Sequence, residues 1–173
     1  MIEPIVQDYL EAAQKMDSQG FCQQLDVPVL VTAAHGIDPS FQSAPTRMLA
    51  EEDRVAMLRR VRLDHRARVL ELRPQRPNRL GQVTIGRSET NDLVLADETV
   101  SSQHAIYMPD PKTSRPIIQD LQSTNGSRIN DHPLLPGRSA FVRDGDQLSF
   151  GDAGFLFYTP EGLYQALRAL LSE

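Results

Sequence analysis

The sequence predicts a mainly β protein: a two-sheet β-sandwich with an N-terminal helical extension and a C-terminal helix. Between residues 66 and 158, apolar runs of three to six residues alternate with Pro, Asn-Gly and Asp-Gly turn signals. Many short strands at this spacing are typical of two packed antiparallel sheets. At both ends of the chain the apolar residues instead recur every three to four positions, which is the spacing of an amphipathic helix.

The first 64 residues are predicted to be mostly helical. One helical stripe over residues 2–16 is formed by Ile2, Ile5, Val6, Tyr9, Leu10 and Ala13. Asp17 or Ser18 can cap a second short helix. The apolar run from Pro28 to Val31 is either a strand or a buried extended segment. Thr46 can cap a further helix that continues to about Val61.

The strands of the sandwich are predicted from alternating apolar residues bounded by turn residues. The predicted strands are Val69–Leu72, Gln82–Ile85, Leu93–Leu95, Ala105–Met108, Ile117–Leu121, Arg128–Ile129, Ala140–Val142, Gln147–Phe150 and Phe155–Tyr158. We expect the last two to form a hairpin across Gly151–Gly154, with Leu148 and Phe150 facing Phe155 and Phe157.

These patterns divide the chain into three parts: a helical N-terminal extension (1–64), the β-sandwich (65–160) and a C-terminal helix (161–173). Residues 1–64 carry six Lys or Arg against ten Asp or Glu, whereas residues 65–160 carry eleven of each. The extension is therefore acidic, and the sandwich is balanced.

Composition argues against several function classes. Nucleic-acid binding usually needs a basic stripe, and here the arginines alternate with acids. No apolar run reaches the roughly 18–20 residues that span a bilayer, and the N-terminus lacks the pattern of a secretory signal. Because a single cysteine, Cys22, cannot form an internal disulfide, we expect a cytoplasmic protein. The four His and Cys22 show no metal-ligand spacing, so no metal and no cofactor are expected.

Three short polar motifs lie in loops of the predicted sandwich. They read Gly86-Arg87-Ser88, Ser101-Ser102-Gln103-His104 and Ser123-Thr124-Asn125-Gly126-Ser127, with Asn130 close behind. Together they supply an arginine, several hydroxyls and a carboxamide. Arginine and hydroxyl donors suit a phosphate, which brings charge and three acceptor oxygens. This set favours phosphate binding over bond cleavage.

The order and spacing of these motifs resemble the forkhead-associated (FHA) domain, a phosphothreonine-peptide reader, over roughly residues 66 to 160. The late segment Gly145-Asp146-Gln147-Leu148-Ser149-Phe150-Gly151 also resembles that family's Gly-Asp-x-Ile-x-Phe-Gly strand. The resemblance implies a phosphopeptide-binding adaptor without a catalytic residue. Its partner would be a phosphothreonine-containing protein, for example a Ser/Thr kinase or its substrate.

The resemblance also assigns roles to individual residues. Arg87, Ser101 and Thr124 would bind the phosphate, and Ser102, which stands where many members have arginine, would act as a weaker neutral donor. Asn125 would bind the peptide backbone, joined by Asn130. Gly86, His104 and Gly126 would support the loops. Thr99 and the turn at Asp131-His132-Pro133 would form the rim that reads neighbouring peptide residues.

Two other functions are compatible with parts of this sequence. Ser101, His104 and Asp120 could be arranged as a hydrolytic set, although the sequence has no Gly-x-Ser-x-Gly elbow. Alternatively, the chain could be a phosphate-independent FHA-like scaffold in a protein assembly. The retention of Arg87, Ser101, Thr124 and Asn125 favours the phosphate-dependent function. The two differ in whether these side chains converge on one open pocket.

Overall fold

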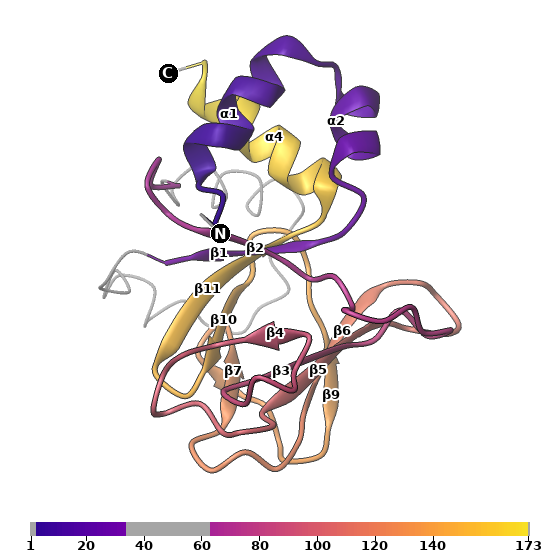
Figure 1. Cartoon of the computed structure of the whole chain (residues 1–173), viewed down its shortest axis with the longest axis vertical. Coiled ribbons are helices and arrows are strands. Elements are labelled where there is room, and N and C mark those ends of the chain that lie inside the picture. Colours follow the sequence, from indigo (N-terminus) through magenta and orange to yellow (C-terminus); the bar gives the residue numbers. More distant parts are fainter. Residues whose placement is uncertain (1–2, 34–62, 173) are drawn as a thin grey trace.

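Two β-sheets pack face to face, and a layer of helices covers one of them, in the computed structural model shown in Figure 1. The structure describes residues 3–33 and 63–172. The helix predicted from Thr46 to Val61 therefore lies outside the described residues. Mostly β structure in two sheets, with helices at both ends, confirms the predicted fold class.

The helical layer contains α1 (Val6–Lys15), α2 (Ser18–Gln24) and α4 (Pro160–Leu170). The side chain of Asp17 accepts a hydrogen bond from the Gly20 N–H and caps α2, as predicted. Thr159 caps α4 in the same way, accepting from the Gly162 N–H. Figure 1 shows the three helices grouped at one end of the molecule, with both termini beside them.

The larger sheet has six strands and includes one strand from the predicted helical extension. Its order is β2 (Val69–Glu71), β1 (Val29–Thr32), β11 (Ala153–Tyr158), β10 (Gln147–Phe150), β7 (Ser127–Ile129) and β8 (His132–Pro133). β1 pairs antiparallel with β2 on one side and with β11 on the other. The run from Pro28 to Val31 thus lies inside the sheet. The division into 1–64, 65–160 and 161–173 stays a prediction.

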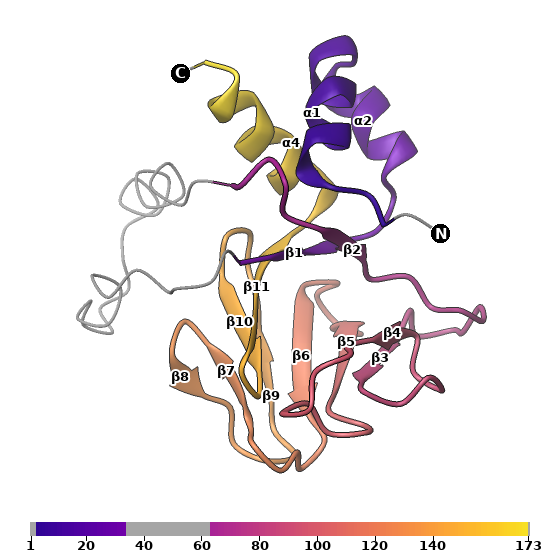
Figure 2. The same ribbon diagram turned by 60° about the vertical axis from the view of Figure 1, so that its left-hand side comes forward.

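The smaller sheet has five strands. Its order is β4 (Leu93–Val94), β3 (Val83–Gly86), β5 (Ala105–Pro109), β6 (Pro116–Asp120) and β9 (Ser139–Phe141). The β3–β4 pair is parallel, and the other neighbours are antiparallel. Figure 2 shows this sheet set apart from the helices by the larger sheet.

The larger sheet separates two apolar cores because side chains alternate across a strand. On β11, Phe155 and Phe157 point into the core between the sheets, whereas Leu156 and Tyr158 point toward the helices. On β1, Leu30 belongs to the first core, while its two neighbours belong to the second. A sheet with both faces covered explains why these strands read as nearly continuous apolar runs.

The hairpin between β10 and β11 differs in register from the prediction. A four-residue connection would pair Phe150 with Phe155, but in the structure Phe150 pairs with Ala153 and Leu148 pairs with Phe155. The connection is therefore the two residues Gly151 and Asp152, and not four. Gly151 has φ +57°, a left-handed conformation that glycine tolerates, and this allows so short a turn.

Candidate functional site

The three polar motifs lie on loops that are hydrogen-bonded to one another at one edge of the sandwich. The Arg87 N–H donates to the Ser101 carbonyl at 2.9 Å, and the Ser88 N–H donates to the Ser102 carbonyl at 3.1 Å. The Thr124 N–H donates to the Ser101 hydroxyl oxygen at 3.0 Å. The loop after β3, the loop before β5 and the loop after β6 therefore form one continuous surface.

Gly86 permits the closest of these approaches. A Cβ at this position would lie 2.4 Å from the Ser102 carbonyl oxygen and 2.8 Å from Asn91 Nδ2. The Asn91 carboxamide also bridges the two loops, because its Nδ2 donates to the carbonyls of Ser88 and Ser102. The buried Asn91 thus joins Gly86 in holding the two loops together.

Arg87 is exposed and is oriented by a single hydrogen bond of its guanidinium. Its Nε donates to the Val100 carbonyl at 3.1 Å. No acidic side chain in the described parts of the chain forms an ion pair with it, neither Glu89 nor Asp92. Asp92 instead accepts from Thr84 and from the Gln75 backbone. Both terminal nitrogens of Arg87 therefore remain available as charged donors.

The hydroxyls predicted to bind phosphate lie on the same surface. Since the Ser101 oxygen accepts from the Thr124 N–H, the Ser101 hydroxyl hydrogen remains available for donation. Ser102 and Thr124 are exposed, and their hydroxyls form no hydrogen bond with a described residue. The site thus presents hydroxyl donors beside the loop that carries Arg87.

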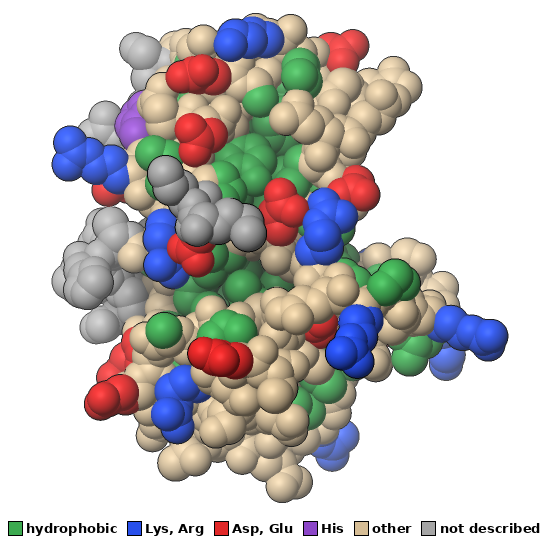
Figure 3. All heavy atoms as spheres, in the orientation of Figure 1, with side chains coloured by type: hydrophobic (Ala, Val, Ile, Leu, Met, Phe, Trp, Pro, Cys, Tyr) green, Lys and Arg blue, Asp and Glu red, His purple; other side chains and the backbone are tan. Residues whose placement is uncertain are grey.

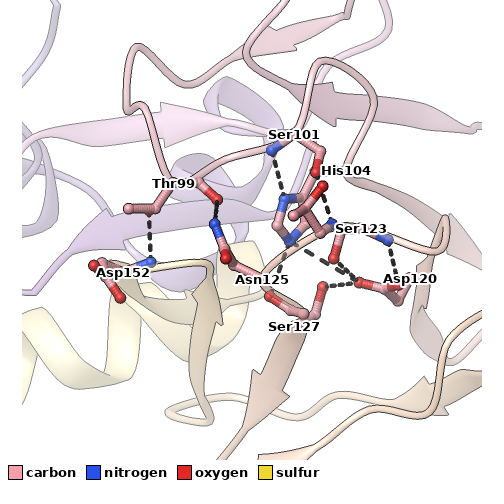
Figure 4. A network of polar contacts seen from close by, with 10 residues as sticks. Thr99, Ser101, His104, Asp120, Ser123, Asn125, Ser127 and Asp152 are labelled. Carbon is pink, nitrogen blue, oxygen red and sulfur yellow. Dashed lines mark hydrogen bonds and ion pairs between the residues drawn. The ribbon is translucent and has the colours of Figure 1, made fainter.

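Asn125 is fixed by a contact to the loop before β5. Its Nδ2 donates to the Thr99 carbonyl at 2.8 Å, as Figure 4 shows. Thr99 is itself held on both sides: its hydroxyl donates to Asp97 and accepts from the Asp152 N–H. The exposed carboxamide of Asn125 is therefore oriented before any ligand binds, with its oxygen free of described partners.

His104 is fully buried and holds two of the loops together. Its Nδ1 accepts from the Ser101 N–H at 3.0 Å, so Nε2 carries the proton and donates to the Gly126 carbonyl at 3.1 Å. Burial lowers the pKa of His104, which keeps the imidazole neutral. The Gly126 carbonyl also accepts from the Gly151 N–H, so this glycine joins a third loop to the site.

The geometry does not assemble the hydrolytic alternative. The imidazole of His104 contacts the backbone N–H of Ser101, while the Ser101 hydroxyl contacts Thr124. A serine nucleophile would need its hydroxyl on the imidazole. Asp120 lies 3.9 Å from His104 Nε2, and it is occupied by other donors.

Asp120 is a buried carboxylate that organises the third loop. Its oxygens accept from the Ser123 N–H, the Ser123 hydroxyl and the Ser127 hydroxyl, at 3.0, 2.6 and 2.6 Å (Figure 4). Burial by itself raises the pKa of Asp120, but these hydrogen bonds outweigh it and hold the pKa below its ordinary value. The ionised carboxylate thus fixes the residues on either side of Thr124 and Asn125.

Asn130 lies apart from this hydrogen-bonded group, in the turn between β7 and β8. Its Nδ2 donates to Asp146 at 3.0 Å, and its Oδ1 accepts from the Gln147 N–H at 2.9 Å. Asp146 also accepts from the Arg143 N–H, which ties this turn to the loop before β10. Both ends of the Asn130 carboxamide are engaged inside the protein, so its contact with a peptide stays a prediction.

Sequence reasoning missed the importance of three residues around the site. Thr99 was assigned only to the rim, Asp120 only to the hydrolytic alternative, and Gly151 only to a turn. A Cβ on Gly151 would lie 2.4 Å from the Thr99 carbonyl oxygen, so this glycine allows the β10–β11 turn to pack on Thr99. The sequence signal for the role of Asp120 is the pair of serines that follows it, Ser123 and Ser127, because their hydroxyls can donate to its carboxylate.

An apolar groove of about 230 Å³ lies at the other end of the molecule, between α1, α2 and β2. Tyr9, Phe21 and Leu25 line it, with Glu71 at its edge, and Figure 3 shows hydrophobic side chains in this hollow. Within residues 3–33 and 63–172, no group of His, Cys, Asp or Glu could hold a metal ion. None of the helices described there is long and apolar enough to cross a membrane.

Comparisons with known proteins agree with the motif pattern. The sequence model of the FHA domain matches residues 83–151. Rat mediator of DNA damage checkpoint protein 1 is 36% identical over 78 residues, which cover 44% of this chain and 6% of the rat protein. An ABC transporter ATP-binding/permease protein of Mycobacterium tuberculosis is 33% identical over 88 residues, or 47% of this chain and 10% of that protein.

The chain thus spans a tenth or less of the length of these two relatives. Among solved structures, one from an analysis of phosphothreonine-dependent FHA domain interactions is 26% identical, with a TM-score of 0.43. It covers 53% of this chain and 84% of that one. The FhaA FHA domain in complex with the intracellular domain of Rv3910 is 28% identical, with a TM-score of 0.41, and covers 48% of this chain and 86% of that one.

Proposed function

Because the sequence model of the FHA domain matches residues 83–151, we propose that this chain binds a phosphothreonine segment of a partner protein. An FHA domain is a binding module, and the proposed role is that of a signalling adaptor. The partner class is a phosphorylated protein, for example a Ser/Thr kinase or its substrate.

The observation that carries this proposal is a set of unused donors on one surface. Phosphothreonine brings a charge of about −1.5 to −2 and three strong acceptor oxygens. Arg87 offers both terminal guanidinium nitrogens, and Ser101, Ser102 and Thr124 each offer a hydroxyl hydrogen. The planar guanidinium can bond two phosphate oxygens at once, and the hydroxyls can serve the remainder.

Asn125 is the proposed contact to the peptide backbone. Its carboxamide lies beside Thr124 in sequence and is oriented by the Thr99 carbonyl. A carboxamide has an acceptor oxygen and a second N–H, so it can accept from and donate to an extended peptide. Gly86, His104 and Gly126 are proposed to act indirectly, through the loop contacts described above.

The exposure of these groups favours phosphate-dependent binding over the scaffold alternative. Arg87, Ser102, Thr124 and Asn125 are all exposed, and no segment among the described residues covers them. A scaffold that does not need phosphate does not require unpaired guanidinium nitrogens and hydroxyls on loops that are hydrogen-bonded to one another. We therefore treat the scaffold as the second candidate.

Binding to a phosphothreonine peptide library tests the proposal, with phosphoserine and unphosphorylated peptides as controls. Arg87→Ala leaves the phosphate charge without its main partner, which costs about 2–5 kcal/mol. The expected loss of affinity is roughly thirtyfold to several thousandfold. Arg168→Ala, which removes an exposed arginine from α4, is the matched control and should bind as the wild type does.

Two results would contradict the proposal. If the folded wild-type protein bound no phosphothreonine peptide, the scaffold alternative would replace it. If Arg87→Ala lost less than about threefold in affinity with its fold intact, Arg87 would not be the phosphate anchor.

A further inference from the structure

Thr99 connects the proposed peptide-binding residue to the turn between β10 and β11. Its carbonyl accepts from Asn125 Nδ2 at 2.8 Å, and its hydroxyl oxygen accepts from the Asp152 N–H at 2.8 Å. Figure 4 shows Asn125 and Asp152 both in contact with Thr99, on the side away from Asp120. Asp152 is therefore part of the same hydrogen-bonded surface as the proposed peptide site.

The position of Asp152 is fixed by its backbone. Gly151 approaches Thr99 so closely that a Cβ there would lie 2.4 Å from the Thr99 carbonyl oxygen. The Gly151 N–H also donates to the Gly126 carbonyl, next to Asn125. With hydrogen bonds from two successive N–H groups, the turn fixes the backbone of Asp152 beside the site.

The charge of this end of the surface is negative. Asp152 is exposed, and within the described residues no Lys or Arg forms an ion pair with it, with Glu98 or with Asp97. Asp97 accepts from the Thr99 N–H and hydroxyl, whereas the carboxylate of Asp152 has no described partner. Asp152 therefore offers a free negative charge, in contrast to the free positive charge of Arg87.

The order of the groups across the surface gives a direction to a bound peptide. Figure 4 shows Ser101, one of the phosphate donors, then Asn125, and then Thr99 with Asp152 beyond it. An extended peptide advances about 3.3 Å per residue, so residues a few positions from the phosphothreonine reach the turn. The side chain that arrives there meets a carboxylate.

We propose that Asp152 is a specificity-determining residue that selects a Lys or Arg near the phosphothreonine, on the side held by Asn125. The inference rests on the proposed phosphopeptide binding. A peptide with a phosphate and a basic residue a few positions away would match Arg87 and Asp152 together, and a peptide with an acid at that place would be rejected. Electrostatic matching of this kind contributes mainly to specificity.

The test is a lysine and glutamate scan of one binding phosphothreonine peptide, with each residue placed in turn at the four positions on either side. For the wild type, we expect one position, or two neighbouring ones, at which Lys binds about two- to fivefold more tightly than Glu, as for exposed ion pairs. Asp152→Asn should make that position neutral. Asp152→Lys should reverse the preference, so that Glu binds more tightly there.

A matched control separates local from general charge effects. Glu11→Lys changes an exposed acid on α1 by the same charge and should leave the scan as in the wild type. The preference should also shrink at about 1 M salt, because the screening length falls to about 3 Å.

The outcomes distinguish this inference from the proposed function. If peptides bind in an Arg87-dependent way but the scan of Asp152→Lys equals that of the wild type, the assignment of Asp152 is wrong and phosphopeptide binding stands. If Glu11→Lys reverses the preference as well, net charge rather than Asp152 determines it. If no phosphothreonine peptide binds, both proposals fail.

Discussion

The two ends of this molecule are held together by different forces. At the helical end, α1, α2 and α4 pack on the larger sheet through apolar side chains such as Leu10, Phe21 and Leu163. At the loop end, buried polar groups such as His104 and Asp120 hold the loops through hydrogen bonds. Apolar packing is nondirectional, whereas hydrogen bonds fix orientation. We therefore expect damage at the helical end to lower stability alone, and damage at the loop end to alter binding as well.

The largest effect on stability is expected from the helical end. Leu163 is fully buried, and Leu163→Ala removes contacts and leaves a cavity, which costs about 2–5 kcal/mol. Chemical denaturation should show this loss, while the folded fraction keeps its affinity for a phosphothreonine peptide. Gln165→Ala, at an exposed position of the same helix, is the control. A large change in peptide affinity for Leu163→Ala would show that the two ends are coupled.

The next effect is expected at the loop end, from Asp120→Asn. This substitution keeps the shape of the side chain but replaces the charged carboxylate that accepts three hydrogen bonds. Hydrogen bonds to a charged acceptor are stronger than those to a neutral one. The free energy of unfolding should fall by about 1–3 kcal/mol, and peptide affinity should fall with it because the Thr124 loop loses its anchor. Glu11→Gln, which neutralises an exposed acid on α1, serves as the control. Unchanged affinity in Asp120→Asn would contradict the contrast between the two ends.

Acid should weaken the loop end before the helical end. The folded-state pKa of His104 lies below its ordinary value of 6.5, so the unfolded chain binds the proton more readily. Stability is then full above pH 6.5 and falls as the pH drops toward the lowered pKa, by at most about 1.4 kcal/mol per pH unit for one proton.

The pKa of Asp120 is also lowered, and its contribution is lost only at more acidic pH, below its ordinary value of 3.8. Denaturation at a series of pH values measures both effects. In His104→Gln the slope just below pH 6.5 should be smaller than in the wild type. If the free energy of unfolding depended on pH equally in both proteins, titratable groups other than His104 would be responsible for the dependence.

The smallest effect is expected from a helix cap. Thr159→Ala removes the hydroxyl that accepts from the Gly162 N–H and donates to Asp144, and such caps contribute about 1 kcal/mol. Thermal denaturation should show a modest decrease, with peptide affinity unchanged. Thr159→Ser, which keeps the hydroxyl, should retain most of the stability. An equal loss in both variants would mean that the methyl group, rather than the cap, is responsible.

Much of the fold could be predicted because its signals are local. The strands around Val83–Ile85 and Ile117–Ile118 alternate clearly, and Asp17 is a typical cap, so these elements were confirmed. The position of β1 in the sheet could not be predicted, because it depends on pairing with strands far away in the sequence. β8 was missed since it is two residues long and includes Pro133.

The candidate site was predictable to the extent that its residues lie in motifs. Hydrogen bonds join the loops that carry Arg87, Ser101, Thr124 and Asn125, and the binding roles of these residues stay a prediction. One part that supports them depends on contacts between segments far apart in the sequence: the β10–β11 turn packs on Thr99. Such contacts leave no spacing in the sequence that local reasoning could detect.

The place of β1 has a consequence for fragment complementation. This strand is hydrogen-bonded along both edges, to β2 and to β11, and Val29, Leu30 and Val31 are all buried. Residues 3–33 are therefore held to the rest by the sheet and by the helical core, in addition to the peptide chain. A polypeptide ending at Ala33 and a second one beginning at Leu63 carry complementary surfaces, and mixing them should reconstitute one folded particle. Residues 83–151 expressed alone would lack β1, β2 and β11, and with them half of the larger sheet.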